Sequence, residues 1–142
     1  MKTDVLSPGK KAQRTAKWAR TMTKWLISFN RQSGARWNLV DFGGTTKSES
    51  RGIVDLLAVR KNHRTDMPGL KRGDILQMVL IQTKGGSAPR PTLDDIARLK
   101  KVAKHHRAMA IVLAEWSKGQ HLELYKLKKN EWVSVRPVEV FG

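Results

Sequence analysis

Three short apolar segments are the feature that most restricts the fold of this chain. Ile53 to Val59, Ile75 to Lys84 and Met109 to Glu115 are rich in Ile, Val and Leu. Runs of this length and composition predict β-strands, largely buried, rather than helices. A polar loop from Lys61 to Gly73 separates the first two runs, and Gly85-Gly86 ends the second. A sheet is therefore expected at the centre of the fold.

Two other segments have helical periodicity. Between Ala12 and Asn30 large apolar residues recur at spacings of three and four, which predicts an amphipathic helix whose stripe faces the core: Trp18, Met22, Trp25, Leu26 and Phe29. A second helix is expected from an N-cap at Thr92 to about His105, with Asp95 three residues after the cap and Asp94 beside it in the positive first turn.

Weaker signals complete the order of elements. Arg36 to Phe42 predicts a strand before the turn at Gly43-Gly44, while His121 to Leu127 and Trp132 to Val138 predict later strands. The expected order is helix, three strands, helix, strand, then one or two more strands. This order predicts an α/β fold with a central mixed sheet flanked by helices.

The charge balance indicates an anionic partner. The chain has 142 residues, with 28 Lys+Arg against 12 Asp+Glu and a formal net charge of +16. Such a surface favours binding to phosphate backbones. The length suits one hydrophobic core, so residues 12–142 are expected to form a single domain. Residues 1–11 have little apolar content and are expected to be a basic flexible tail.

The location expected is cytoplasmic. The chain contains no cysteine, which leaves out disulfides and thiolate metal sites and suits a reducing compartment. No apolar run approaches the length that spans a bilayer, and the first eleven residues lack the apolar core of a secretion signal. We therefore expect no membrane partner.

The candidate chemistry lies on the first two apolar runs. Asp55 interrupts the first run, and the second ends in Gln82-Thr83-Lys84. Alternate residues of a strand share a face, so Gln82 and Lys84 are expected to point the same way. Asp55, Gln82 and the Thr83 carbonyl offer the oxygen ligands that Mg²⁺ or Mn²⁺ requires, and Lys84 offers a compact cation to oppose charge on a phosphate.

This pattern and the order of elements resemble the restriction-endonuclease-like nuclease superfamily, in particular the branch with Holliday-junction resolvases. The family signature is an Asp on one strand and Glu-x-Lys on the next, in an αβββαβ sandwich. The resemblance implies an endonuclease that hydrolyses DNA phosphodiesters, with Asp55 and Gln82 as magnesium ligands and Lys84 facing the attacked phosphate. Some members dimerise, so a homodimer is an open expectation.

Two departures from the family pattern concern acidity. Gln82 stands where the family usually has Glu, and the helix Ala12 to Asn30 lacks the acidic residue that the family places there. Glu49, just before the Asp55 strand, is the candidate replacement in the catalytic set, and Asp41 is a weaker one.

The residues expected to hold DNA are basic and lie on the first helix, before the Asp55 strand and in the loop after it. They are Arg14, Lys17, Arg20, Lys24, Arg51, Lys61, Arg64, Lys71 and Arg72. No small-molecule cofactor is expected. Two alternatives stay open: a nuclease fold with a disabled site that only binds DNA, and a basic RNA-binding protein.

Overall fold

A six-stranded mixed sheet organises the chain. The computed structural model describes residues 8–43, 52–64, 66–86, 88–116 and 121–142, with the side chains of the first helix described from Arg14 onward. The elements in chain order are α1 (Pro8–Asn30), β1 (Asn38–Asp41), β2 (Leu56–Asn62), β3 (Ile75–Gly85), α2 (Leu93–His106), β4 (Ala110–Trp116), β5 (Glu123–Lys128), β6 (Glu131–Val135) and α3 (Pro137–Phe141).

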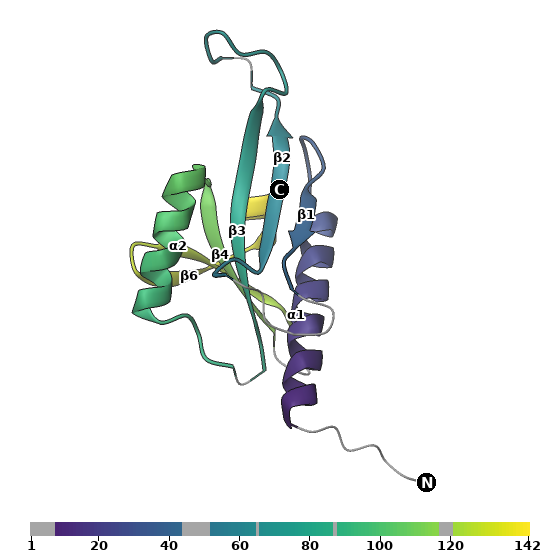
Figure 1. Ribbon diagram of the computed structural model, residues 1–142. Helices are drawn as coiled ribbons and strands as arrows, with labels where there is room; N and C mark the ends of the chain where they lie inside the picture. Colours follow the sequence, from purple (N-terminus) through teal and green to yellow (C-terminus); the bar gives the residue numbers. More distant parts are fainter. Residues whose placement is uncertain (1–7, 44–51, 65, 87, 117–120) are drawn as a thin grey trace.

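The strands follow one another across the sheet in the order β1-β2-β3-β4-β5-β6. All neighbouring strands pair antiparallel except β3 and β4, which are parallel. A parallel pair cannot be joined by a hairpin, so the chain crosses over through α2 between them. Figure 1 shows α1 and α2 on opposite sides of the sheet. The expected α/β class with a mixed sheet is confirmed.

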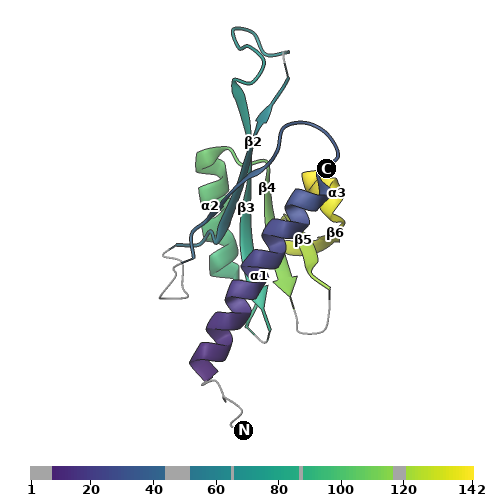
Figure 2. The same cartoon turned by 90° about the vertical axis from the view of Figure 1, so that its right-hand side faces the viewer.

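Each face of the sheet has its own apolar cluster. On the α1 side, Ile27 and Phe141 pack with Leu56, Val79 and Val112 of the central strands. On the other side, Leu99 of α2 packs with Ile53 and Ile111. In Figure 2, α1 and α3 lie in front of the sheet and α2 lies behind it. Within the described residues, no helix combines the length and apolarity needed to cross a bilayer.

The buried face of α1 differs from the sequence expectation. Trp18, Met22, Trp25 and Phe29 are exposed, and the helix packs on the sheet through a face that includes Ala19, Arg20, Thr23 and Ile27. The polar members of this face have local partners: the Thr23 hydroxyl donates to the Ala19 carbonyl at 2.6 Å, and Arg20 is ion-paired with Asp41. The stripe that sequence periodicity assigned to the core is therefore on the surface, apart from the half-buried Leu26.

The start of β2 and the end of β6 also differ from the sequence expectation. β2 begins at Leu56, three residues later than expected, so Asp55 lies directly before the strand. β3 ends at Gly85, within one residue of its predicted end. The expected strand to Val138 is wrong beyond Val135, because Pro137 cannot donate to a ladder and instead starts the short helix α3.

The β2–β3 hairpin extends past its neighbours. Pairing of β1 with β2 reaches only to Val59, and pairing of β4 with β3 starts at Val79, so the hairpin outside this point is two-stranded. We call residues 60–78 the arm; it projects from the top of Figure 1. Arg60 fixes its base, because its Nε donates to Gln77 Oε1 at 2.9 Å and its guanidinium lies 4.2 Å from the centre of the Trp37 ring.

The N-terminus of α2 has the predicted capping box. The Thr92 hydroxyl accepts from the Asp95 N–H at 3.1 Å, and the Asp95 carboxylate accepts from the Thr92 N–H at 2.9 Å. The hydrogen bond from the Thr92 N–H is the main cause of the lowered pKa of the Asp95 carboxyl. The expectation made from the sequence is confirmed.

Replacing Thr92 by Ala is expected to destabilise the protein by about 1 kcal/mol, because one helix N–H loses its acceptor. The measurement is urea unfolding followed by circular dichroism. Thr92→Ser, which keeps the hydroxyl, is the control and should unfold close to the wild-type midpoint. Equal midpoints for the Ala variant and the wild type would contradict the role given to this cap.

Candidate active site

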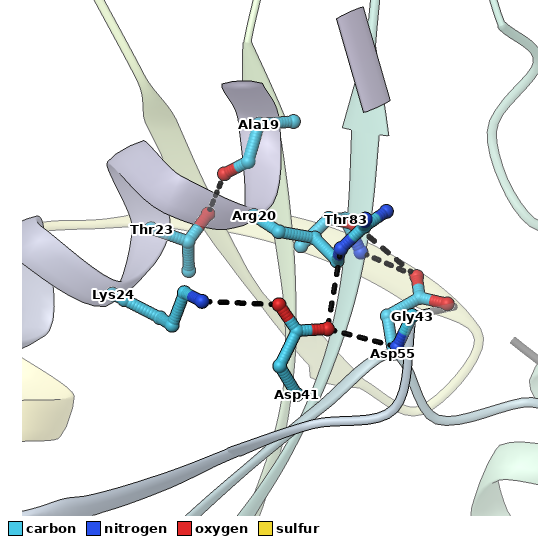
Figure 3. Close-up of polar contacts among 8 residues, drawn as sticks. All are labelled: Ala19, Arg20, Thr23, Lys24, Asp41, Gly43, Asp55 and Thr83. Carbon is cyan, nitrogen blue, oxygen red and sulfur yellow. Dashed lines mark hydrogen bonds and ion pairs between the residues drawn. The ribbon is translucent and has the colours of Figure 1, made fainter. Parts of the chain in front are cut away.

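Asp55 is fixed against the end of β3. Its backbone N–H donates to the Ile81 carbonyl at 3.0 Å, and its carbonyl accepts from the Phe42 N–H at 3.0 Å. Its carboxylate Oδ2 accepts from the Thr83 backbone N–H at 2.8 Å and lies 3.4 Å from the Thr83 hydroxyl (Figure 3). The Asp55 carboxylate therefore touches the middle residue of Gln82-Thr83-Lys84, whereas Gln82 and Lys84, whose side chains alternate with that of Thr83, bind Ile53 and Gly86.

Gln82 has a defined amide orientation. Its Nε2 donates to the Ile53 carbonyl at 2.7 Å, so Oε1 is the branch that can serve as an acceptor or cation ligand. A glutamate at this position would set a carboxylate oxygen against the Ile53 carbonyl, and two acceptors repel. Glutamine therefore suits this position better than glutamate.

Lys84 reaches toward β4. Its ammonium donates to the Gly86 carbonyl at 3.0 Å and lies 3.9 Å from Glu115 Oε2, and its side chain is only 14% exposed. Glu115 is the register partner of Lys84 in the parallel β3–β4 pair. The Glu115 carboxylate also accepts from Arg90 Nε at 2.9 Å.

Glu115 is a member of this cluster that sequence reasoning missed. The hydrogen bond from Arg90 is the main cause of its lowered pKa, and the charges of Arg90 and Lys84 act in the same direction against burial. The Arg90 guanidinium also lies 4.6 Å from the centre of the Tyr125 ring. The sequence signal was an acid at the end of a buried run, but its register with Lys84 depends on the parallel pairing.

A second group of charges lies beside Asp55. Arg20 Nε is 3.2 Å from Asp41 Oδ1, and Lys24 Nζ donates to Asp41 Oδ2 at 3.0 Å. The Gly43 N–H also donates to Asp41, at 2.8 Å. Burial raises the pKa of Asp41, but the Gly43 hydrogen bond and the two cations outweigh it, so the pKa is lowered. Figure 3 shows this group next to Asp55 and Thr83.

Arg20 is therefore part of the site rather than of the outer surface. Arg20 comes from α1 and is 8% exposed. Gly43 leaves room for it: a Cβ on Gly43 would lie 2.5 Å from both Nε and Cζ of Arg20. Asp41, the weaker candidate for the additional acid, is ion-paired with Arg20 and Lys24.

The other predicted residues have varied positions. Arg14 and Lys17 are exposed on α1, whereas Lys24 is half-buried at Asp41. Four predicted phosphate contacts lie exposed on the arm: Lys61, Arg64, Lys71 and Arg72. Arg64 is paired with Asp66 at 2.6 Å, and Arg72 lies 3.4 Å from His63 Nδ1. Glu49 and Arg51 lie outside the described residues.

Across the described ranges, no group of three or more His, Cys, Asp or Glu side chains could hold a metal ion. Among the described residues, the oxygen donors near Asp55 are its own carboxylate, the Gln82 amide and backbone carbonyls, together with the Asp41 carboxylate, which Arg20 and Lys24 already bind. Comparison of the chain with protein-family models, curated proteins and solved structures found no match.

The contact between Gly43 and Arg20 predicts a coupled pair of substitutions. Gly43→Ala should destabilise the wild type by about 1–3 kcal/mol, because the added methyl group displaces a buried guanidinium. In an Arg20→Ala background the same change should cost much less, since the atoms that it meets are gone.

The measurement is a double-mutant cycle by urea unfolding. A coupling energy near zero would contradict the packing of Arg20 against Gly43. Gly69→Ala, at a glycine with no atom within contact distance of an added Cβ but with φ +80°, controls for backbone strain and should show no coupling with Arg20→Ala.

Proposed function

We propose that this protein is a metal-dependent DNA phosphodiesterase with a restriction-endonuclease-like fold. The observation that carries the proposal is the contact of the Asp55 carboxylate with Thr83, the residue between Gln82 and Lys84. This contact brings the acid to the strand end that carries the triplet, although the Thr83 side chain faces the opposite side of β3 from those of Gln82 and Lys84.

The order of elements supports the same family. A helix, three antiparallel strands, a crossover helix and a strand parallel to the third follow one another from α1 to β4. This is the αβββαβ order that the sequence resemblance implied. β5 and β6 extend the sheet beyond β4 and leave the proposed site at the β2–β3–β4 ends unchanged.

The residues present suit a weakly held Mg²⁺ or Mn²⁺. Asp55 and the Gln82 Oε1 would be the side-chain ligands, and the Thr83 carbonyl, waters and the substrate phosphate would complete a set of oxygens. Glu49 remains the proposed additional acid. When bound, the cation supplies Lewis-acid stabilisation of the phosphate and lowers the pKa of bound water.

Lys84 is proposed to act on the phosphate. An ammonium held at one point by the Gly86 carbonyl needs little rearrangement to oppose negative charge that develops on a phosphoryl oxygen. Glu115 Oε2 lies 3.9 Å from the Lys84 ammonium and is also bound to Arg90. In this proposal Glu115 orients Lys84 but does not neutralise its charge completely. Arg20 lies near Asp55 rather than Lys84, and its buried positive charge is partly offset by Asp41.

The arm and the part of α1 that precedes Trp18 are proposed to hold the DNA backbone. Lys61, Lys71 and Arg72 project on a two-stranded hairpin beyond the sheet, and Arg14 and Lys17 lie on α1. Contacts of this kind fix the position of a duplex without reading its sequence.

A disabled nuclease fold that binds DNA for another enzyme is the second candidate. The pairing of Asp41 with Arg20 and Lys24 favours it, because this carboxylate is neutralised and Asp55 is left as the acid nearest the triplet in the described part of the site. Binding with no cleavage under any metal would select this candidate.

Asp55→Asn and Lys84→Ala should each lower the cleavage rate by about 100-fold or more, because each removes a charge that acts on the phosphate or its metal. The asparagine can still accept the Thr83 hydrogen bond, so folding should be kept. The measurement is cleavage of labelled duplex, branched and single-stranded DNA with Mg²⁺ and with Mn²⁺.

Lys128→Ala is the matched control, because Lys128 is an exposed lysine on β5. It should cleave at the wild-type rate. No cleavage of any substrate by the wild type, or cleavage undiminished in both site variants, would end the enzyme proposal.

The arm predicts a salt-dependent contribution to DNA affinity. In Lys71→Ala/Arg72→Ala, the slope of log K against log salt should become shallower by about 2 at most, since up to two phosphate contacts are lost. Lys101→Ala/Lys104→Ala on α2 removes the same charge from exposed positions elsewhere and should leave the slope near that of the wild type. Equal changes in the two variants would show that only net charge matters.

A further inference from the structure

The side of α1 that faces away from the sheet carries a row of large apolar side chains. Trp18, Met22, Trp25 and Phe29 are 47%, 36%, 61% and 79% exposed. We call these four residues the seam. Trp25 and Phe29 already touch edge to face, with ring centres 6.0 Å apart.

The spacing of the seam is that of a helix-packing interface. Its residues follow at intervals of four, three and four, which are the d and a positions of a heptad repeat. Successive residues at this spacing lie along one narrow line of an α-helix, where a second helix can insert its own side chains between them. The residues that pack on the sheet, among them Arg20, Thr23 and Ile27, lie on the opposite side of the same helix.

The exposed area approaches what a stable contact requires. Taking these side chains at about 200 Å² each, the seam exposes roughly 450 Å² of mainly apolar surface per chain. A self-association would bury about twice this area, roughly 900 Å², from the seam alone, which is close to the lower bound of about 1,000 Å² for a specific interface. Patches of this size on a monomer are commonly interaction sites.

The seam is complementary to itself in one orientation. If two copies of α1 run antiparallel about a twofold axis between residues 22 and 25, Trp18 meets Phe29 of the partner subunit and Met22 meets Trp25 of the partner subunit. In an antiparallel pair of helices, each layer of the interface joins an a position to a d position. Both contacts, Trp18 with Phe29 and Met22 with Trp25, join a d position to an a position. A twofold contact of this kind closes and stops at two copies.

The charges beside the seam are compatible with a second copy. Thr21 and Ser28 border the seam on one side, and the apolar Leu26 borders it on the other side. Lys24 is turned toward Asp41, to which it is bound at 3.0 Å. The rows nearest the seam are thus neutral between Trp18 and Phe29, whereas Arg14, one turn before Trp18 in the row of Thr21 and Ser28, and the net charge of +16 oppose association.

We propose that a second copy of this chain binds the seam, so that two α1 helices pack antiparallel and form a homodimer. Because the seam and the site face opposite sides of α1, the dimer leaves both copies of the site open. The inference does not depend on the proposed function.

Sedimentation equilibrium of the full chain, free of DNA, tests the association. A monomer–dimer equilibrium is expected, and the dimer should strengthen as salt rises because salt screens the like charges. Trp25→Gln/Phe29→Gln should raise the dissociation constant at least tenfold. Met67→Gln/Leu70→Gln, at two apolar residues exposed on the arm, is the control and should dimerise like the wild type.

Cysteine cross-linking tests the orientation, and the chain has no cysteine of its own. An oxidised mixture of Trp18→Cys and Phe29→Cys chains should give a mixed disulfide dimer, while each variant alone should stay largely uncross-linked. Cross-linking of either variant with itself at equal yield would overturn the antiparallel arrangement.

Two further results would overturn the proposal as a whole. One is a monomer at every concentration and salt. The other is a wild-type chain that stays monomeric while single-stranded DNA quenches its tryptophan fluorescence and Trp25→Gln/Phe29→Gln abolishes the quenching, which would assign the seam to base stacking. Loss of DNA cleavage with dimerisation intact would count against the proposed function alone.

Discussion

The register of β3 against its two neighbours is the constraint on which the candidate site depends. Antiparallel pairing with β2 brings Asp55 to Thr83, and parallel pairing with β4 brings Glu115 to Lys84. A shift of either register by one residue would turn the paired side chains to the other face of the sheet. The crossover helix α2, with its capping box, is what makes the parallel pair possible.

Local features of the fold were predictable because their causes are local. The capping box depends only on Thr92 and Asp95, three residues apart, and the end of β3 is marked by Gly85-Gly86. The buried face of α1 was not predictable in this way, because the apolar stripe normally faces the core. Here the Thr23 hydroxyl donates to the Ala19 carbonyl one turn earlier, and Arg20 is ion-paired with Asp41, which only the folded chain brings near it.

In the candidate site too, the features with local causes were predictable and those with long-range causes were not. Strand alternation predicts that Gln82 and Lys84 lie on the same side of β3. The contact of Asp55 with Thr83 agrees with the prediction that the Asp55 segment and β3 are neighbours. The roles of Arg20 and Glu115 could not be read from the chain, since each depends on how an element packs or pairs over a long distance in sequence. The amide contact of Gln82 with the Ile53 carbonyl likewise needs the folded backbone. Whether these residues act on DNA stays a prediction.

The most direct measurement of the central claim is the position of Mn²⁺ by anomalous diffraction from crystals soaked with the metal. The account predicts one peak bounded by Asp55 and the Gln82 amide oxygen, and its absence from crystals of Asp55→Asn. A peak held only by other residues, or no peak at these side chains at a concentration that supports cleavage, would contradict the assignment of Asp55 and Gln82 to a metal centre.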